Sequence, residues 1–187
     1  TTETVTRVLL ADGLGADPMR LAPYLHQMSV GSRIGVAYEL ARPKRWTDGT
    51  RAVLLGLMSD ASAEVRRAAI KGFAECVPTD AEARDLERLL TRSGGELRTG
   101  VLAALRRQAD AQALASADRL LSSKHKNQRL AGLELLRGLV EEKRAVAECH
   151  ARAARVKAGT PDQAASQHLD AILRAEAAAP TLLDALG

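Results

Sequence analysis

The 187-residue chain contains only four aromatic residues, Tyr24, Tyr38, Trp46 and Phe73. All-β sandwiches and barrels fill their pleated surfaces with aromatic and β-branched side chains, so this scarcity argues against an all-β fold. It also argues against proteins that bind single-stranded nucleic acid by stacking bases on aromatic rings.

Cysteine and long apolar runs are scarce as well. Cys76 and Cys149 form no CxxC pair and are expected to be reduced residues of a helical core, which favours a cytoplasmic protein. No run approaches the ~20 apolar residues of a membrane span, and no signal-peptide pattern opens the chain, so we expect no membrane partner. Because the chain begins at Thr1 and ends at Gly187 without the features of natural termini, we expect it to be part of a larger protein.

Alanine and leucine are abundant and together supply 63 of the 187 residues. Both are strong helix formers, so the composition predicts an all-α fold. The formal net charge is +4, with 27 Lys and Arg against 23 Asp and Glu. This mild excess is too small to indicate a nucleic-acid-binding protein by itself.

A repeat of about 32 residues runs through the middle of the chain. Four nine-residue segments each carry Arg at the second position, a small residue two positions later and a large apolar residue at the end. The arginines are Arg33, Arg66, Arg98 and Arg129, and the small residues are Gly35, Ala68, Gly100 and Ala131. Leucine-rich helix ends and short polar turns precede each segment, which predicts a pair of helices per repeat. The small residues predict close approach of neighbouring helices.

Capping patterns predict several helix boundaries. Thr79 and Glu82 have the spacing of a capping box, and Asp48 and Asp110 are candidate N-caps. Residues from about 139 to 157 are predicted to form one long helix that ends before Gly159. A last helix is expected from Thr160 to about residue 178, with Thr160 as its N-cap.

The segment from Leu57 to Ala69 resembles the consensus Leu–x–Asp–x–x–x–x–Val–Arg–x–x–Ala of the HEAT repeat, in the phycobilisome-lyase-type, HEAT-like form of bacteria. The resemblance implies a single right-handed α-solenoid domain of about four helix pairs. Residues 1–17 would be an N-terminal cap, 18–140 the repeats and 141–187 a C-terminal helical cap. In such repeats the arginine at this position usually connects the turn of one unit to the next through hydrogen bonds. The resemblance therefore implies a structural role for Arg33, Arg66, Arg98 and Arg129.

In a HEAT-like solenoid the second helix of each pair lines the concave, binding surface. Helical spacing places a mixed, mildly basic set of side chains there: Tyr38, Arg42, Arg67, Lys71, Arg106, Glu134 and Arg137. We expect this stripe to bind a protein partner or another domain of the same polypeptide, which makes the chain a non-catalytic scaffold. The alternative is an ordinary solvated helix face.

Two short basic runs are further candidates for binding anions. The run from Arg42 to Trp46 combines cations with an aromatic ring, although a tryptophan in such a loop commonly packs as a lid on the core. Lys124, His125 and Lys126 lie at the start of a predicted helix, where free backbone N–H groups favour anions. The alternative for this second run is a solvated turn.

The sequence assembles no catalytic, cofactor or metal site. Cys149 and His150 are neighbours on a predicted helix, so their side chains diverge by about 100° and do not form a nucleophile–base pair. The four histidines lack metal-binding spacing, and no glycine-rich phosphate loop is present. We therefore expect no enzyme, cofactor or metal.

Nucleic-acid binding is the competing hypothesis. One group of bacterial HEAT-like proteins excises alkylated bases from DNA, and resemblance to it would imply a basic concave groove with aromatic residues and a carboxylate. In this chain Tyr38 is the only aromatic residue of the expected stripe. A third hypothesis is a lyase or chaperone subunit of the phycobilisome-lyase type, for which the sequence shows no chromophore pocket.

Overall fold

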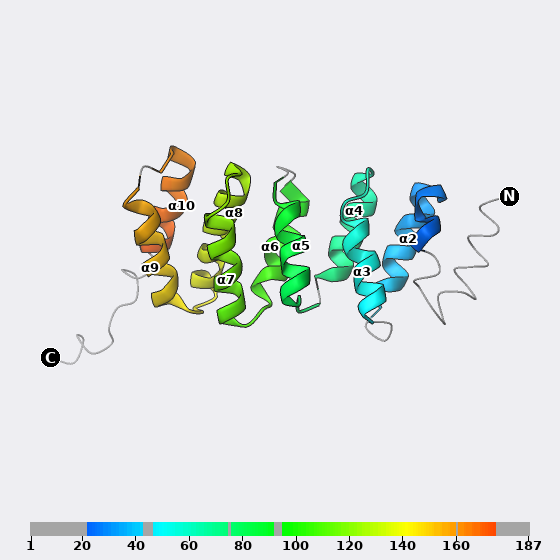
Figure 1. The fold of residues 1–187 in the computed structure, drawn as a ribbon, viewed down its shortest axis with the longest axis horizontal. Helices are drawn as coiled ribbons and strands as arrows, with labels where there is room; N and C mark the ends of the chain where they lie inside the picture. The colour runs from blue at the N-terminus through cyan, green and yellow to red at the C-terminus, as the bar shows by residue number, and fades with distance from the viewer. Residues whose placement is uncertain (1–21, 43–46, 75, 92–94, 160, 175–187) are drawn as a thin grey trace. The chain divides into compact units, whose positions relative to one another are not determined.

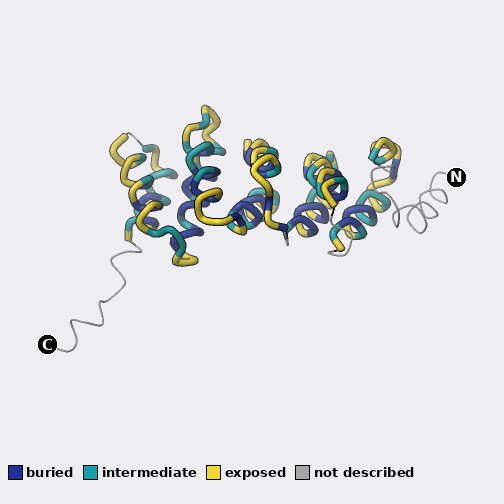
Figure 2. The backbone as a smooth tube through the Cα atoms, turned by 60° about the horizontal axis from the view of Figure 1, so that its bottom comes forward, coloured by how far each residue is buried: buried dark blue, intermediate teal, exposed yellow. Residues whose placement is uncertain are grey.

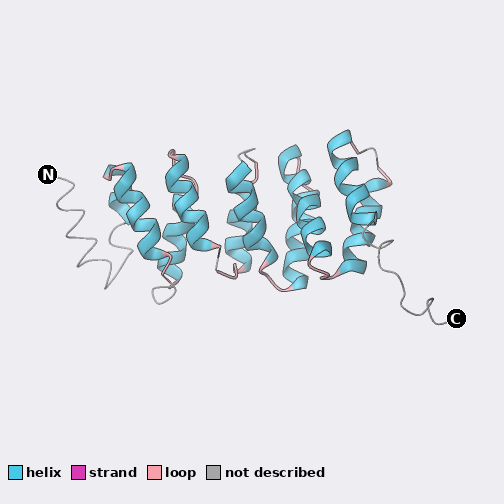
Figure 3. Ribbon diagram, turned by 180° about the vertical axis from the view of Figure 1, so that it is seen from behind, coloured by secondary structure: helices cyan, strands magenta, loops and turns pink. Residues whose placement is uncertain are grey.

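The structure is a computed structural model, and it describes residues 22–42, 47–74, 76–91, 95–159 and 161–174. These described residues form helices joined by short loops, and they contain no strand (Figures 1 and 3). The predicted all-α class is confirmed. The helices are η3 (Ala22–Gln27), α2 (Val30–Leu40), α3 (Asp48–Leu57), α4 (Ala63–Phe73), α5 (Asp80–Leu89), α6 (Gly95–Arg106), α7 (Asp110–Leu121), α8 (Lys126–Glu141), α9 (Val146–Lys157) and α10 (Gln163–Arg174). The expected N-terminal cap, residues 1–17, lies outside the described residues.

The chain divides into two compact units, and the division falls within α6. Unit one comprises residues 1–77 and 94–104, and unit two comprises residues 78–93 and 105–187. In unit one, α4 packs against both α2 and α3. Fully buried side chains from all three helices fill this core, among them Val36, Leu54, Val65 and Phe73.

Unit two is built around α8, which packs against α7, α9 and α10. Further contacts join α9 to α10 and α5 to α7. The buried side of each helix faces its neighbours in the unit (Figure 2). The core is rich in leucine, and its fully buried members include Leu86, Leu120, Leu135, Leu136 and Leu139.

The predicted starts of α3, α5 and α7 agree with the structure to within one residue. The Thr79–Glu82 capping box is confirmed, since Glu82 N–H donates to Thr79 Oγ1 (3.3 Å) and Thr79 N–H donates to the Glu82 carboxylate (2.7 Å). Asp48 and Asp110 are not N-caps but the first residues of their helices. Thr47 caps α3 instead, in a capping box with Thr50.

The predicted long helix over residues 139–157 is wrong, because the chain breaks between α8 and α9. Lys143 and Ala145 have positive φ angles of 57° and 43°, which no α-helix accommodates. Between them, Arg144 donates hydrogen bonds to the backbone oxygens of Arg106 and Gln108 and forms an ion pair with Asp110. These contacts with distant residues hold the connection in a non-helical conformation.

The last helix begins later than predicted. Its first residue is Gln163, and the Asp162 carboxylate accepts the backbone N–H of Ala165 (2.9 Å), as an N-cap does. The predicted cap, Thr160, lies outside the described residues. Asp162 takes this role because its short carboxylate reaches the free N–H groups of the first turn.

Close helix approach occurs at only some of the small residues. A Cβ at Gly100 would collide with the side chain of Ile70 in α4, whereas a Cβ at Gly35 would meet nothing within 4 Å. The expectation therefore fails at Gly35. Gly72, which the repeat pattern does not single out, lies close to the residue that ends α2: an added Cβ would lie 2.6 Å from the Cβ of Ala41.

These packing differences predict opposite effects for the same substitution. Gly35→Ala should raise the free energy of unfolding by about 0.5–1 kcal/mol, since alanine restricts the unfolded chain and favours helix. Gly72→Ala gains the same helix propensity but forces α2 and α4 apart, so a net loss of about 1–2 kcal/mol is expected. Urea unfolding followed by circular dichroism measures both. Stabilisation by Gly72→Ala would contradict the close contact.

Candidate functional site

The repeat arginines hold turns through hydrogen bonds. Arg33 donates from Nε and Nη2 to the two Asp60 carboxylate oxygens (2.8 and 3.0 Å) and from Nη1 to the Met28 backbone oxygen (2.6 Å). Arg66 donates from Nη1 to the backbone oxygens of Asp60 (2.7 Å) and Ala61 (2.8 Å). The turn before α4 is thus held from two successive repeat helices, α2 and α4.

Arg129 makes the corresponding bonds in unit two. Its Nη1 donates to the backbone oxygens of Ser123 (3.0 Å) and Lys124 (2.8 Å) in the turn before α8. Arg98 lies half-buried in α6. A planar guanidinium with several N–H donors can bond to more than one turn carbonyl, as the structural role expected for these arginines needs.

Asp60 is a carboxylate held by several hydrogen bonds. Burial raises its pKa, but the Arg33 hydrogen bond, the Ser62 backbone N–H and the charges of Arg33 and Arg66 together lower it by more, so the net pKa lies below the ordinary value of 3.8. The charged form is therefore favoured by folding.

Four of the predicted binding residues are exposed in unit one, on α2, on α4 or directly after α2. We call Tyr38, Arg42, Arg67 and Lys71 the α2–α4 face. Tyr38 of α2 is 52% exposed, and α2 packs against α4, which carries Arg67 and Lys71. Arg67 Nε donates to Glu96 of α6 (2.6 Å), and this bond raises the pKa of the guanidinium.

The other cations of this face differ in their partners. Arg42 pairs with Glu39 (2.6 Å). Lys71 is exposed and has no ion-pair partner among the residues that the structure describes. The face is therefore mixed in charge and includes a half-exposed tyrosine.

The remaining three predicted binding residues, all in unit two, take part in internal pairs. Arg106 pairs with Glu142 (2.9 Å), and Arg137 pairs with Glu141 one turn along α8 (3.3 Å). Glu134 lies 3.6 Å from the ring of His168 in α10. These three residues belong to unit two, whereas the α2–α4 face belongs to unit one.

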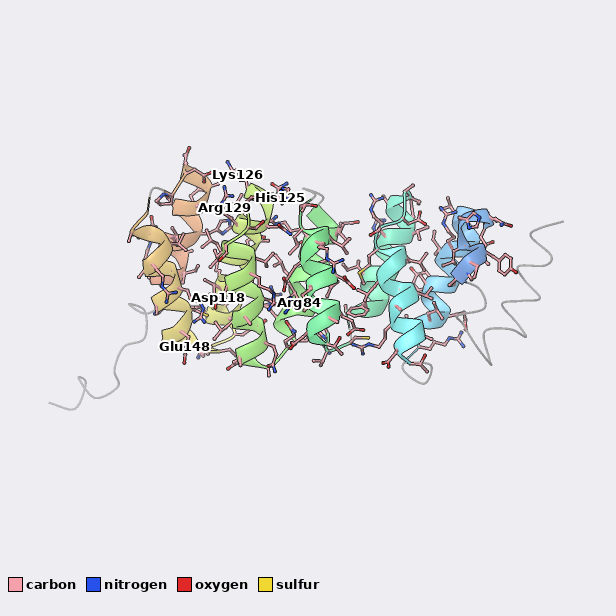
Figure 4. All side chains as sticks on the ribbon, in the orientation of Figure 1. Arg84, Asp118, His125, Lys126, Arg129 and Glu148 are labelled. Carbon is pink, nitrogen blue, oxygen red and sulfur yellow. The ribbon has the colours of Figure 1, made fainter. Side chains whose placement is uncertain are left out.

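Sequence reasoning missed two ion pairs that tie the first helices of successive pairs in unit two. Arg119 of α7 binds both oxygens of Glu87 in α5 (2.7 and 2.9 Å). Arg152 of α9 binds both oxygens of Asp118 in α7 (2.8 and 2.9 Å), and Asp118 is labelled in Figure 4. The partners are 32 and 34 residues apart, so a search for opposite charges at the repeat period would have found them.

The structure offers no obvious nucleophile at the one sequence-adjacent Cys–His pair. Cys149 is buried, and that burial raises the pKa of its thiol to about 11. His150 is also buried, and its Nε2 lies 3.0 Å from the Ile172 backbone oxygen. Among the described residues, no group of three or more His, Cys, Asp or Glu side chains is placed to hold a metal ion.

One candidate of the sequence analysis lies mostly outside the described residues. Residues 43–46, with Trp46, lie outside the described part of the chain, so the basic run after Arg42 has no structural account. No helix within the described ranges has both the length and the apolar character that crossing a membrane demands.

Comparison with known proteins identifies a family but no characterised relative. Neither the curated proteins nor the solved structures include a match to this chain. A family model described as a family of unknown function (DUF5724) matches residues 8–181. That range covers nearly the whole chain, which therefore belongs to this family of unknown function, DUF5724.

Proposed function

We propose that this protein is a non-catalytic interaction module that binds a protein partner, or another domain of the same polypeptide, through the α2–α4 face. The observation that carries the proposal is the pair formed by the half-exposed Tyr38 on α2 and the exposed Arg67 on α4, two helices that pack against each other. Tyrosine and arginine dominate the energetically important positions of protein interfaces, because they combine apolar area with directed hydrogen bonds.

A HEAT-like, right-handed solenoid is the architecture that we propose for the module. Supporting it, corresponding helices of successive pairs contact each other: α2 and α4 in unit one, and α5 and α7, and α8 and α10, in unit two. Solenoids present extended surfaces and bind through them. The two buried, free cysteines, Cys76 and Cys149, support a cytoplasmic location.

A protein partner is favoured over DNA by the pairing of the cations. DNA binding requires several Lys and Arg side chains available to phosphates. On the α2–α4 face, Arg42 and Arg67 are each within 2.6 Å of a carboxylate oxygen, which leaves Lys71 as the cation without one among the described residues. A surface of alternating charge suits a partner of alternating charge.

The triple variant Tyr38→Ala, Arg67→Glu, Lys71→Glu tests the proposal. All three side chains are exposed, so the fold should be retained, and partner affinity should fall by about 100-fold. The partner is identified by cross-linking and affinity purification, and the purified pair is measured by isothermal titration calorimetry. Circular dichroism checks the helical content.

The matched control is Arg84→Glu with Arg155→Glu, which makes the same charge change on exposed cations of unit two. Unchanged affinity in the control together with loss in the triple variant supports the α2–α4 face. Retained binding by the triple variant contradicts it. Titration with duplex DNA at about 50 and about 200 mM salt tests the competing hypothesis, which predicts binding that weakens steeply with salt.

A further inference from the structure

A cavity of about 360 Å³ opens beside the N-terminal end of α8 in unit two. Apolar side chains from α7 to α10 and from the connection before α10 line it: Leu121, Leu130, Leu133, Val156, Pro161 and Ala165. Lys126, Arg129 and Asp162 supply its charged groups. The cavity lining thus combines apolar side chains with charged ones.

Positive charge is concentrated at the N-terminal end of α8. Lys124 lies in the turn before the helix, Lys126 and Arg129 lie in its first turn, and Figure 4 shows Lys126 and Arg129 at the same end of the helix. The first turn of α8 has no acidic residue, and its N-cap, His125, makes no side-chain capping bond. Cations at the positive end of a helix dipole are unfavourable, so an anion bound here would stabilise the arrangement.

The protein supplies only part of that compensation. Asp162 pairs with Lys126 (2.8 Å). Arg129 uses Nη1 for two backbone carbonyls, and neither Arg129 nor Lys124 has a carboxylate partner among the described residues.

The corresponding turn of unit one is different. There Asp60 comes six residues before Arg66, and the charges of Arg33 and Arg66 both favour its carboxylate form. Six residues before Arg129 the chain has Ser123, which carries no charge. The turn before α8 therefore lacks the carboxylate that neutralises its counterpart.

We infer that this cavity binds an acidic peptide segment of a protein partner. Carboxylates of the segment pair with Lys124, Lys126 and Arg129, and an adjacent leucine-like side chain packs against the apolar side chains. The volume lies at the low end of ligand pockets and suits one or two side chains. The inference rests on the proposed function, because its partner is also a protein, but it concerns a separate surface.

A titration of the ¹⁵N-labelled protein tests the inference. The probe is the acetylated and amidated peptide Asp-Leu-Glu-Leu, and its control is the uncharged isostere Asn-Leu-Gln-Leu. The acidic peptide should shift the amide signals of Leu121, residues 126–133 and Ala165, and the isostere should bind at least about tenfold more weakly.

Two variants locate the site by different means. Lys124→Glu with Lys126→Glu reverses the charge and should weaken the acidic peptide at least about tenfold. Ala165→Met fills the cavity without changing charge and should weaken it about fivefold. Arg84→Glu, a charge reversal that Figure 4 places away from Lys126 and Arg129, should bind the peptide as the wild type does.

Three outcomes would overturn the inference: signal shifts confined to other helices, equal affinity for the isostere, or full reproduction of the shifts by inorganic phosphate. The last would identify a site for small anions. The Tyr38→Ala, Arg67→Glu, Lys71→Glu variant should bind the tetrapeptide normally. If the wild type does not bind the tetrapeptide, the proposal for the α2–α4 face still stands. If the triple variant retains its protein partner, the tetrapeptide result still stands.

Discussion

Replacing Asp60 by Asn is expected to lower the free energy of unfolding by about 2–3 kcal/mol at pH 7, because several hydrogen bonds to one charged group are weakened together. The carboxylate accepts two bonds from Arg33 and one from the Ser62 N–H (2.8 Å). Its side chain is only 12% exposed and that of Arg33 only 15%. The variant therefore leaves a largely buried guanidinium without its counter-ion.

The effect of Asp60→Asn should depend on pH in a defined direction. Because the folded pKa lies below the ordinary 3.8, the carboxylate stabilises the fold above that value and loses this contribution as pH falls through the folded pKa. The stability gap between wild type and variant should thus be full at pH 7 and close progressively below about pH 3.8. Urea unfolding across this range measures the gap. A gap that stays constant in acid would refute the ion pair, and Asp48→Asn, at an exposed helix start, is the control.

Arg119→Leu should destabilise unit two by about 3 kcal/mol, since it removes one partner of a largely buried ion pair. The Glu87 side chain is 9% exposed, and Arg119 binds both of its oxygens. The double variant Glu87→Leu with Arg119→Leu removes the buried charge as well and should recover much of the loss. Urea unfolding of the single and double variants gives the coupling free energy.

Arg88→Leu is the matched control for Arg119→Leu. Arg88 pairs with Asp85 one turn away, but the two side chains are 75% and 48% exposed, so a change below about 0.5 kcal/mol is expected. Equal losses in Arg119→Leu and Arg88→Leu would show that the Glu87 pair contributes no more than a surface pair.

Local sequence signals predicted the helices well and their interruptions poorly. Leucine-rich ends, polar turns and the Thr79 capping box act within a few residues, so they are visible in the sequence. The break between α8 and α9 contains neither proline nor glycine, and the positive φ angles there accompany bonds from Arg144 to residues 34–38 positions earlier. A signal of that range is absent from local composition.

The candidate site shows the same division. Helical spacing correctly found exposed side chains such as Tyr38 and Lys71. It did not find the carboxylates that pair with Arg67 and Arg106, because Glu96 and Glu142 belong to other parts of the chain. Periodicity indicates which side of a helix is exposed, whereas the partners depend on how helices pack.

The range of the described ties has a consequence for folding. The bonds from Arg33 to Asp60 and from Gln128 to the Glu87 backbone oxygen, which join neighbouring helix pairs, span 27 and 41 residues. Loops of these lengths differ in closure entropy by less than about 0.5 kcal/mol. Neighbouring helix pairs can therefore form at nearly equal entropic cost. Such low contact order favours folding in milliseconds or less, with no single pair obliged to form first.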